Sequence, residues 1–132
     1  MIRQLSVSLF LLLLMSLLPA CSMEKPSSQM KVTSMEKDVD KSKSGFEICS
    51  SLNLTKNDVV NYFSVAEPVD EYNFYSNADI MPCKYRGSIT INDDALDWII
   101  MAGGAAYLYK DGAIDKRYLC TEKCCEAIPG LC

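Results

Sequence analysis

Hydrophobic and polar positions alternate along the second half of the chain. From Cys83 to Ile91, Tyr85, Gly87, Ile89 and Ile91 alternate with Arg, Ser and Thr residues. A period of two is typical of a half-buried β-strand. Similar strand patterns cover residues 96–101, 105–109 and 113–120, with turn residues at 92–94, 103–104 and 110–112. The pattern therefore predicts an antiparallel meander of about four strands.

Two short helical segments are predicted to flank this meander. Thr55 and Asp58 have the spacing of a capping box, and four apolar residues follow within positions 59–63. Thr121 could begin a last helical turn, which Pro129-Gly130 would end. The predicted fold class is therefore α+β. Its core is expected to contain Tyr85, Ile89, Ile91, Leu96, Trp98, Ile100, Leu108 and Leu119.

The segment 66–82 is both aromatic and acidic. Pro68 and Pro82 argue against one long regular element there. The segment is either a loop that packs its aromatic residues on the sheet, or a recognition surface. The candidate partner-binding residues are Glu67, Asp70, Glu71, Tyr72, Phe74 and Tyr75.

The residues before position 46 divide into a hydrophobic and a polar part. Residues 1–20 have a short positive start and an uncharged, leucine-rich stretch that is too short to cross a bilayer, which predicts a signal peptide. Residues 22–45 are polar and contain no aromatic residue. We expect a flexible tether over 21–45, with a marginal helix over 32–39 as an alternative, and a globular domain over 46–132.

The end of the signal peptide, Leu18-Pro19-Ala20-Cys21, resembles the lipobox of bacterial lipoproteins. Pro19 departs from this motif, because a small or hydroxyl residue is more usual there. The resemblance implies that Cys21 is acylated and attaches the chain to the lipid bilayer. Ser22 implies the periplasmic face of the outer membrane, although this rule varies between bacteria and leaves the inner membrane open. The alternative is an ordinary signal peptide that is cleaved after Ser22.

The chain contains seven cysteines, and six remain when Cys21 is set aside. An even number in an exported domain predicts three disulfides. No pair has the CxxC spacing that zinc ribbons and thioredoxins use, so no metal is expected. The pairing stays open, but adjacent Cys124 and Cys125 should have different partners. Cys83 and Cys120 should lie near the carboxy-terminal cysteines, and Cys49 should link the first helix to that cluster. The disulfide candidates are Cys49, Cys83, Cys120, Cys124, Cys125 and Cys132.

Composition excludes several classes of function. The chain has no histidine, which excludes Ser-His and Cys-His catalysis and histidine metal sites. Its net charge is −4, and it becomes −5 when Arg3 leaves with the signal peptide. Such a chain is a poor nucleic-acid binder. The acidic turn at 92–97 lacks the spacing of a calcium loop, and no cofactor is expected.

These observations favour a non-catalytic, lipid-anchored envelope protein that binds another, unknown periplasmic protein. It could act as an immunity protein or inhibitor, or as an accessory of the envelope. The alternative is a small periplasmic hydrolase that uses its acidic residues.

Overall fold

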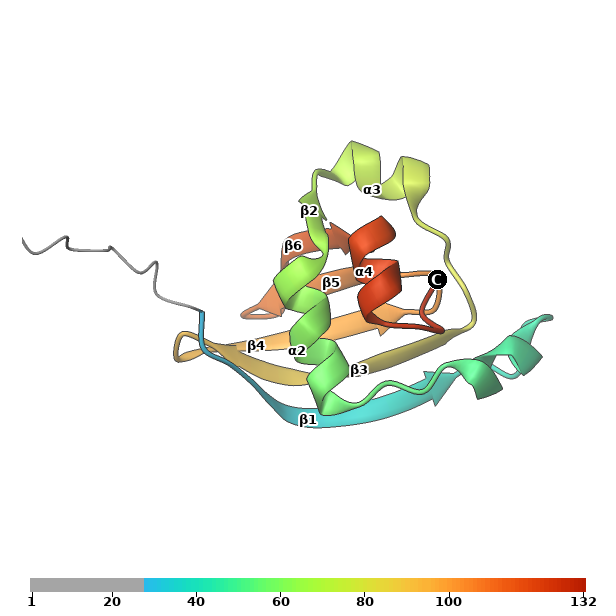
Figure 1. Cartoon of the computed structure of the whole chain (residues 1–132), viewed down its shortest axis with the longest axis horizontal. Helices are drawn as coiled ribbons and strands as arrows, with labels where there is room; N and C mark the ends of the chain where they lie inside the picture. Colours follow the sequence, from blue (N-terminus) through green and yellow to red (C-terminus); the bar gives the residue numbers. More distant parts are fainter. Residues whose placement is uncertain (1–27) are drawn as a thin grey trace, which may run out of the picture.

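The structure, a computed structural model, describes residues 28–132. The predicted signal peptide, Cys21 and the first part of the predicted tether lie outside this range. Within it, the chain forms a six-stranded antiparallel sheet and several short helices (Figure 1). In chain order the elements are β1 (Met30–Val39), η2 (Phe46–Ser51), α2 (Lys56–Val65), β2 (Glu67–Val69), α3 (Glu71–Asn77), β3 (Cys83–Ile91), β4 (Asp94–Met101), β5 (Ala105–Lys110), β6 (Ala113–Leu119) and α4 (Glu122–Ala127).

The four strands that the alternating pattern predicted are confirmed as β3 to β6. They are consecutive in a sheet whose order is β1-β3-β4-β5-β6-β2. Asn92 and Asp93 connect β3 to β4 with φ angles of 49° and 70°, and Asp111 and Gly112 connect β5 to β6 with φ angles of 52° and 78°. Asn, Asp and Gly tolerate this left-handed backbone, which suits tight hairpins.

The prediction of a flexible tether over 21–45 is wrong for Met30–Val39, which forms β1 and pairs along its length with β3. The alternative of a helix over 32–39 is wrong for the same reason. Val32 is the one residue of β1 that is buried, and a β-bulge lies between Val32 and Ser34. The ordered domain therefore begins before residue 46. Gly87 lies beside this bulge, where a side chain would overlap the carbonyl oxygen of Ser34.

The segment 66–82 contributes a short strand and a helix that the sequence pattern did not predict. β2 pairs with β6 and forms one end of the sheet, so the missing N–H of Pro68 is tolerated there. Asp70 then caps α3 by accepting a hydrogen bond from the N–H of Asn73, at 2.8 Å. The sheet thus has six strands instead of about four.

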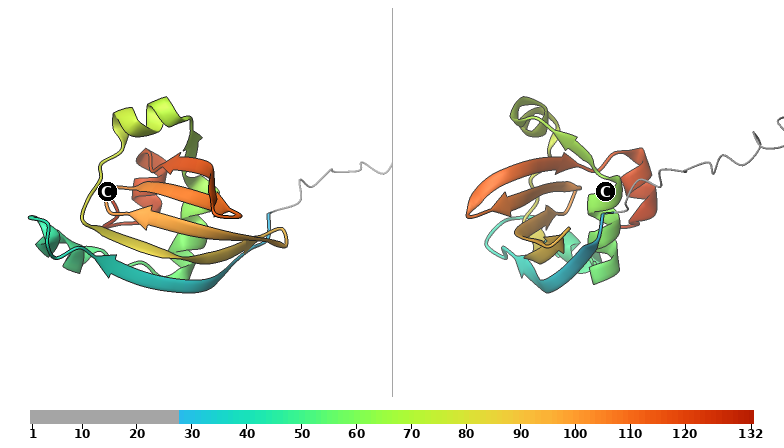
Figure 2. Two further views of the ribbon diagram at one scale, coloured as in Figure 1. Left: turned by 180° about the vertical axis from the view of Figure 1, so that it is seen from behind. Right: turned by 90° about the vertical axis from the view of Figure 1, so that its left-hand side faces the viewer.

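The helices lie on both faces of the sheet (Figures 1 and 2). α2 and α4 cover the face that we call the inner face, and α3 packs on the opposite, outer face. α2 begins with the predicted capping box and contributes Val59, Tyr62 and Phe63 to the inner core. The Tyr62 hydroxyl donates to the carbonyl of Gly104, at 2.6 Å. Within residues 28–132, no helix is long and apolar enough to cross a membrane.

The predicted core is largely correct. The inner core holds the buried residues Tyr85, Ile89, Leu96, Trp98, Ile100 and Leu108. Ile91 is partly buried against that core, and Leu119 packs instead against a second cluster on the outer face. That second cluster is centred on Phe74, Met101 and Ala105.

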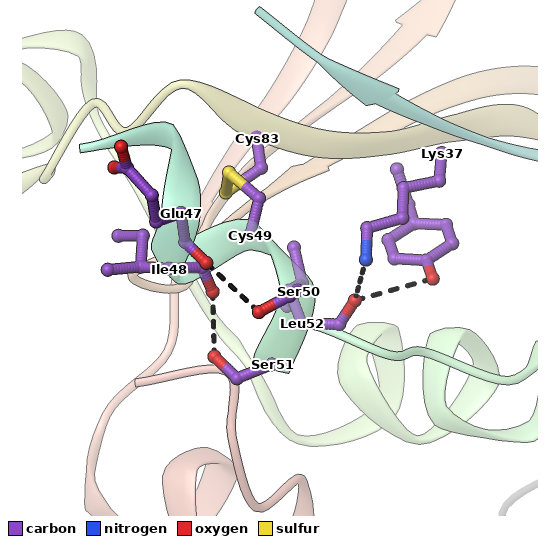
Figure 3. The surroundings of a disulfide bond; sticks show 9 residues. Lys37, Glu47, Ile48, Cys49, Ser50, Ser51, Leu52 and Cys83 are labelled. Carbon is purple, nitrogen blue, oxygen red and sulfur yellow. Dashed lines mark hydrogen bonds between the residues drawn. A yellow bond between two sulfur atoms is a disulfide. The ribbon is translucent and has the colours of Figure 1, made fainter. Parts of the chain in front are cut away.

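All six domain cysteines form disulfides, as predicted. The pairs are Cys49–Cys83, Cys120–Cys124 and Cys125–Cys132, so Cys124 and Cys125 do have different partners. Cys49 lies in η2 and bonds to the first residue of β3 (Figure 3). The partner of Cys49 therefore belongs to the expected cluster. The expectation is wrong about the helix, because Cys49 lies in η2 and precedes the predicted first helix.

Candidate functional site

The outer face of the sheet carries two rows of side chains that run across the strands. One row consists of Ser34, Ser88, Asp97 and Tyr109, which are neighbours in the register of β1, β3, β4 and β5. The Ser88 N–H donates to Ser34 Oγ and the Ser88 hydroxyl donates to Asp97 Oδ1, both at 2.9 Å. This row is therefore held in place by its own hydrogen bonds.

The second row lies two residues further along each strand. It consists of Glu36, Arg86, Ile99, Tyr107 and Arg117, from β1 to β6. Glu36 and Arg86 form an exposed ion pair at 3.7 Å. Exposed pairs of this kind contribute little to stability. Both rows therefore begin with polar side chains on β1 and β3, which are serines in the first row and an ion pair in the second, and both reach a tyrosine on β5.

Helix α3 covers only one part of the outer face. Phe74 is fully buried and packs on Tyr107, with their ring centroids 4.8 Å apart. Glu71 forms an ion pair with Arg117 of β6 at 3.9 Å. α3 is thus fixed over the end of the sheet where β5 and β6 lie.

The part of the outer face that α3 leaves open contains a shallow groove of about 540 Å³. Its floor is formed by the central strands, and Tyr109 lies on its border with the aromatic part of the face. The lining residues that project from the outer face are Ser34, Glu36, Arg86, Ser88, Asp97, Ile99 and Tyr109. The groove therefore combines charged and hydroxyl groups with the aliphatic side chain of Ile99 and the ring of Tyr109.

Four tyrosines connect α3 to this groove, and we call them the tyrosine surface: Tyr72, Tyr75, Tyr107 and Tyr109. The side chains of Tyr72 and Tyr75 are 79% and 60% exposed. They are three residues apart on α3, so they lie on neighbouring positions of the helix surface. The rings of Tyr107 and Tyr109 follow on β5, with centroids 5.8 Å apart.

The ionisation of the strand tyrosines reflects their partial burial beside α3. Burial, together with the nearby hydroxyl of Tyr75, raises the pKa of Tyr107 to about 12. Burial also raises the pKa of Tyr109, while the positive charge of Arg117 acts in the opposite direction. Both side chains are therefore neutral phenols at physiological pH and can donate hydrogen bonds to a ligand.

The six residues proposed from the sequence for partner binding have different environments. Tyr72 and Tyr75 are exposed, whereas Phe74 belongs to the core beneath α3. Asp70 and Glu71 are exposed but engaged, one as the helix cap and the other with Arg117. Glu67 lies exposed on β2. The structure thus separates the residues that support α3 from those that face outward.

Sequence reasoning missed Tyr107 and Tyr109 as members of this surface. A signal was present, because these residues alternate with Leu108 and must share the face opposite to it. It indicated a strand but did not show that α3 would lie beside that face.

The carboxy-terminal cysteines form a second cluster. The sulfur atoms of Cys120, Cys125 and Cys132 lie within 4.8 Å of one another. Such a group could hold a metal as thiolates, but each of these sulfur atoms is bonded to another sulfur in a disulfide. The arrangement therefore fits two adjacent bridges.

Comparison of the chain with protein-family models, with curated proteins and with solved structures found no match in any of the three.

Proposed function

We propose that this protein is a lipid-anchored envelope protein that binds another periplasmic protein through the tyrosine surface. The observation that carries the proposal is the exposure of Tyr72 and Tyr75 on α3, with Tyr75 beside Tyr107 and Tyr109 of the sheet. Large aromatic side chains that are exposed together mark protein interaction sites. Tyrosine is also one of the residue types that dominate binding energy at interfaces.

The lipid anchor and the outer-membrane location rest on the lipobox-like segment that ends at Cys21 and on Ser22. The three disulfides agree with export, since such bridges persist in oxidising compartments. An immunity protein or inhibitor of a periplasmic toxin or hydrolase is one version of the proposal, and an envelope accessory is the other. The identity of the bound protein distinguishes them.

The acidic residues favour binding over the alternative of a small hydrolase. Most glycoside hydrolases, for example, use a pair of carboxyl groups that flank the scissile bond. Here Asp70 accepts the capping hydrogen bonds of α3 and Glu71 reaches Arg117. Their positions are explained by the support that they give to the helix that presents Tyr72 and Tyr75.

The test is capture of the partner from an envelope extract by the immobilised protein, with Tyr72→Ala and Tyr75→Ala as variants. Truncation of a tyrosine that anchors an interface costs about 2 kcal/mol, so we expect roughly a thirtyfold loss of affinity. Because both side chains are exposed, the melting temperature should be nearly unchanged. Phe74→Ala should instead lower the stability by about 3–5 kcal/mol, because it removes a buried ring.

Val65→Ala is the matched control. Val65 is also exposed, at 41%, but it lies at the end of α2 and away from α3. The Val65→Ala variant should capture the partner with the same affinity as the unchanged protein. The proposal would be contradicted if the Tyr72 and Tyr75 variants captured the partner as well as the unchanged protein does. It would also be contradicted if the Val65 variant lost as much affinity as the tyrosine variants.

A further inference from the structure

Strand β1 presents a long free edge. It is the terminal strand of the sheet, and within residues 28–132 no strand lies beyond it (Figures 1 and 2). β1 has ten residues, whereas β2 at the opposite end has three. A free edge carries unpaired N–H and C=O groups and is a template for an added strand.

The hydrogen bonds at the two ends of β1 show which of its backbone groups are free. The carbonyl of Gln29 accepts from the N–H of Asn92 at 2.9 Å, and the N–H of Asp40 donates to Pro82 at 2.8 Å. Residues 29 and 40 therefore direct their backbone groups toward β3 and the loop before it. In an antiparallel ladder this direction alternates with every residue.

Counting inward from both ends identifies the outward-directed residues. Met30 and Val32 direct their N–H and C=O groups away from β3 on one side of the bulge, and Met35, Lys37 and Val39 do so on the other side. Because the bulge inserts one extra residue between Val32 and Ser34, the alternation changes phase there. The first four of these residues project their side chains from the inner face, since they lie opposite Ile91, Ile89, Gly87 and Tyr85.

A second copy of β1, related by a two-fold axis, fits this pattern. When the axis passes between Thr33 and Ser34, Val32 lies opposite Met35 of the second copy and Met30 lies opposite Lys37. In both pairs the backbone groups of the two residues are directed outward, toward the other copy. In every pair of this register, the two side chains lie on the same face of the sheet as each other. A shift by two residues instead places Ser34 opposite Met35, or Val32 opposite Thr33, and those residues lie on different faces.

The same register is complementary in charge. Lys31 and Glu36 both lie on the outer face and are exposed. The register places Lys31 opposite Glu36 of the second copy, and the two-fold axis repeats this contact. Opposite charges at directly paired positions stabilise a sheet, and like charges destabilise it.

We propose that two copies of this chain pair antiparallel through β1, with Val32 opposite Met35, Met30 opposite Lys37, and two Lys31–Glu36 ion pairs across the interface. This dimer joins two six-stranded sheets into one continuous sheet. It goes beyond the proposed function, because β1 and the tyrosine surface lie at different ends of the sheet. Each copy therefore keeps its tyrosine surface accessible.

The experiment is an exchange of charge at positions 31 and 36. The mature protein is purified in a mild detergent, and its mass is measured by sedimentation with the detergent matched in density. Lys31→Glu and Glu36→Lys each replace two attractive pairs with two repulsive ones, so we expect each to raise the dimer dissociation constant about tenfold or more. The double variant restores opposite charges across the interface and should bind more tightly than either single variant, although it also loses the Glu36–Arg86 ion pair within each copy.

Hydrogen exchange provides a second readout. The amides of Met30, Val32, Met35 and Lys37 should become protected as the protein concentration increases, whereas those of the exposed turn at 111–112 should not. A monomer at all concentrations would overturn the proposal, and so would a dimer that both single variants leave intact. A double variant weaker than either single variant would also overturn it. None of these outcomes affects the capture test at Tyr72 and Tyr75.

Discussion

Tyr107 combines a structural and a surface role in one side chain. Its ring packs on the buried Phe74, while its position beside Tyr109 makes it part of the tyrosine surface. The cause of its raised pKa is first of all burial, with the Tyr75 hydroxyl as a second cause. The folded protein therefore keeps the phenolic proton of Tyr107 at a pH where an unfolded chain has lost it.

This difference predicts that the protein becomes less stable at alkaline pH. The ordinary pKa of tyrosine is 10.0, and that of Tyr107 in the folded protein is about 12. The favourable contribution is complete below pH 10 and is lost as the pH rises toward 12, because the unfolded chain then binds fewer protons than the folded one. The pKa values of Tyr62, Tyr109 and Tyr118 are raised as well and act in the same direction.

Denaturant unfolding at about pH 9 and about pH 11 measures this effect. The midpoint should fall between these two conditions. Tyr107→Phe should show a smaller fall, because it has no proton to lose. An equal fall in both proteins would mean that Tyr107 titrates normally.

At the scale of elements, the strands differ in how clearly their sequences reveal them. On β4, the side chains of Leu96, Trp98 and Ile100 project from the inner face and are buried in the core. The residues between them project from the outer face and are more exposed, so the alternation is clear in the sequence. β1 buries only Val32, and its bulge interrupts the period of two. β1 is a polar edge strand, and what defines it is its backbone hydrogen bonds with β3. The pattern of hydrophobic residues contains little information about such bonds.

Helix α3 was missed for a related reason. Its seven residues contain one fully buried side chain, Phe74, which is too few to show a helical period. The sequence suggested Asp70 only as a candidate partner-binding residue, and Pro68 argued against a long regular element. The exposed tyrosines of α3 could thus be proposed as a surface, while the helix that presents them could not.

The three disulfides should contribute unequally to stability. Cys49 and Cys83 are 34 residues apart, whereas Cys125 and Cys132 are seven apart. A bridge that closes a longer loop removes more conformational entropy from the unfolded chain. We expect loss of the first bridge to cost about 4 kcal/mol and loss of the second about 2.5 kcal/mol.

The paired variants Cys49→Ala with Cys83→Ala, and Cys125→Ala with Cys132→Ala, test this order by denaturant unfolding. Replacing both cysteines of a bridge avoids a free thiol. The first pair should also expose η2 to proteolysis, because that bridge ties η2 to β3 (Figure 3). The reverse order of stabilities would show that loop length does not determine these contributions.

At the scale of the whole molecule, the candidate site is a product of the tertiary structure. Tyr75 and Tyr107 are far apart in the chain and meet only because β2 pairs with β6 and turns α3 back over the outer face. The topology that achieves this depends on β2, which hydrophobic patterning did not reveal. The sequence therefore predicted one half of the tyrosine surface and could not locate the other.

Attachment of the whole molecule to a membrane is tested through Cys21. If the proposed lipid anchor is correct, Cys21→Ser should move the protein from the membrane fraction to the soluble fraction. Each buried CH₂ of an acyl chain contributes about 0.8 kcal/mol, and more than one chain makes the attachment stable. Mass spectrometry of the mature amino terminus provides the control, because a chain that starts at Met23 without an acyl mass would contradict the anchor.

The position of β1 also determines how the domain responds to mechanical force. A pull on the amino-terminal segment reaches the sheet at Gln29, whose N–H donates to Asn92 Oδ1 at 3.0 Å and whose carbonyl accepts from the Asn92 N–H. A pull along the strand loads the whole β1–β3 ladder in shear, so that its hydrogen bonds resist together. A pull away from the edge opens the ladder one bond at a time, beginning with the Gln29–Asn92 pair. The domain should therefore withstand tension along β1 far better than tension across it, and Asn92 is the residue at which peeling starts.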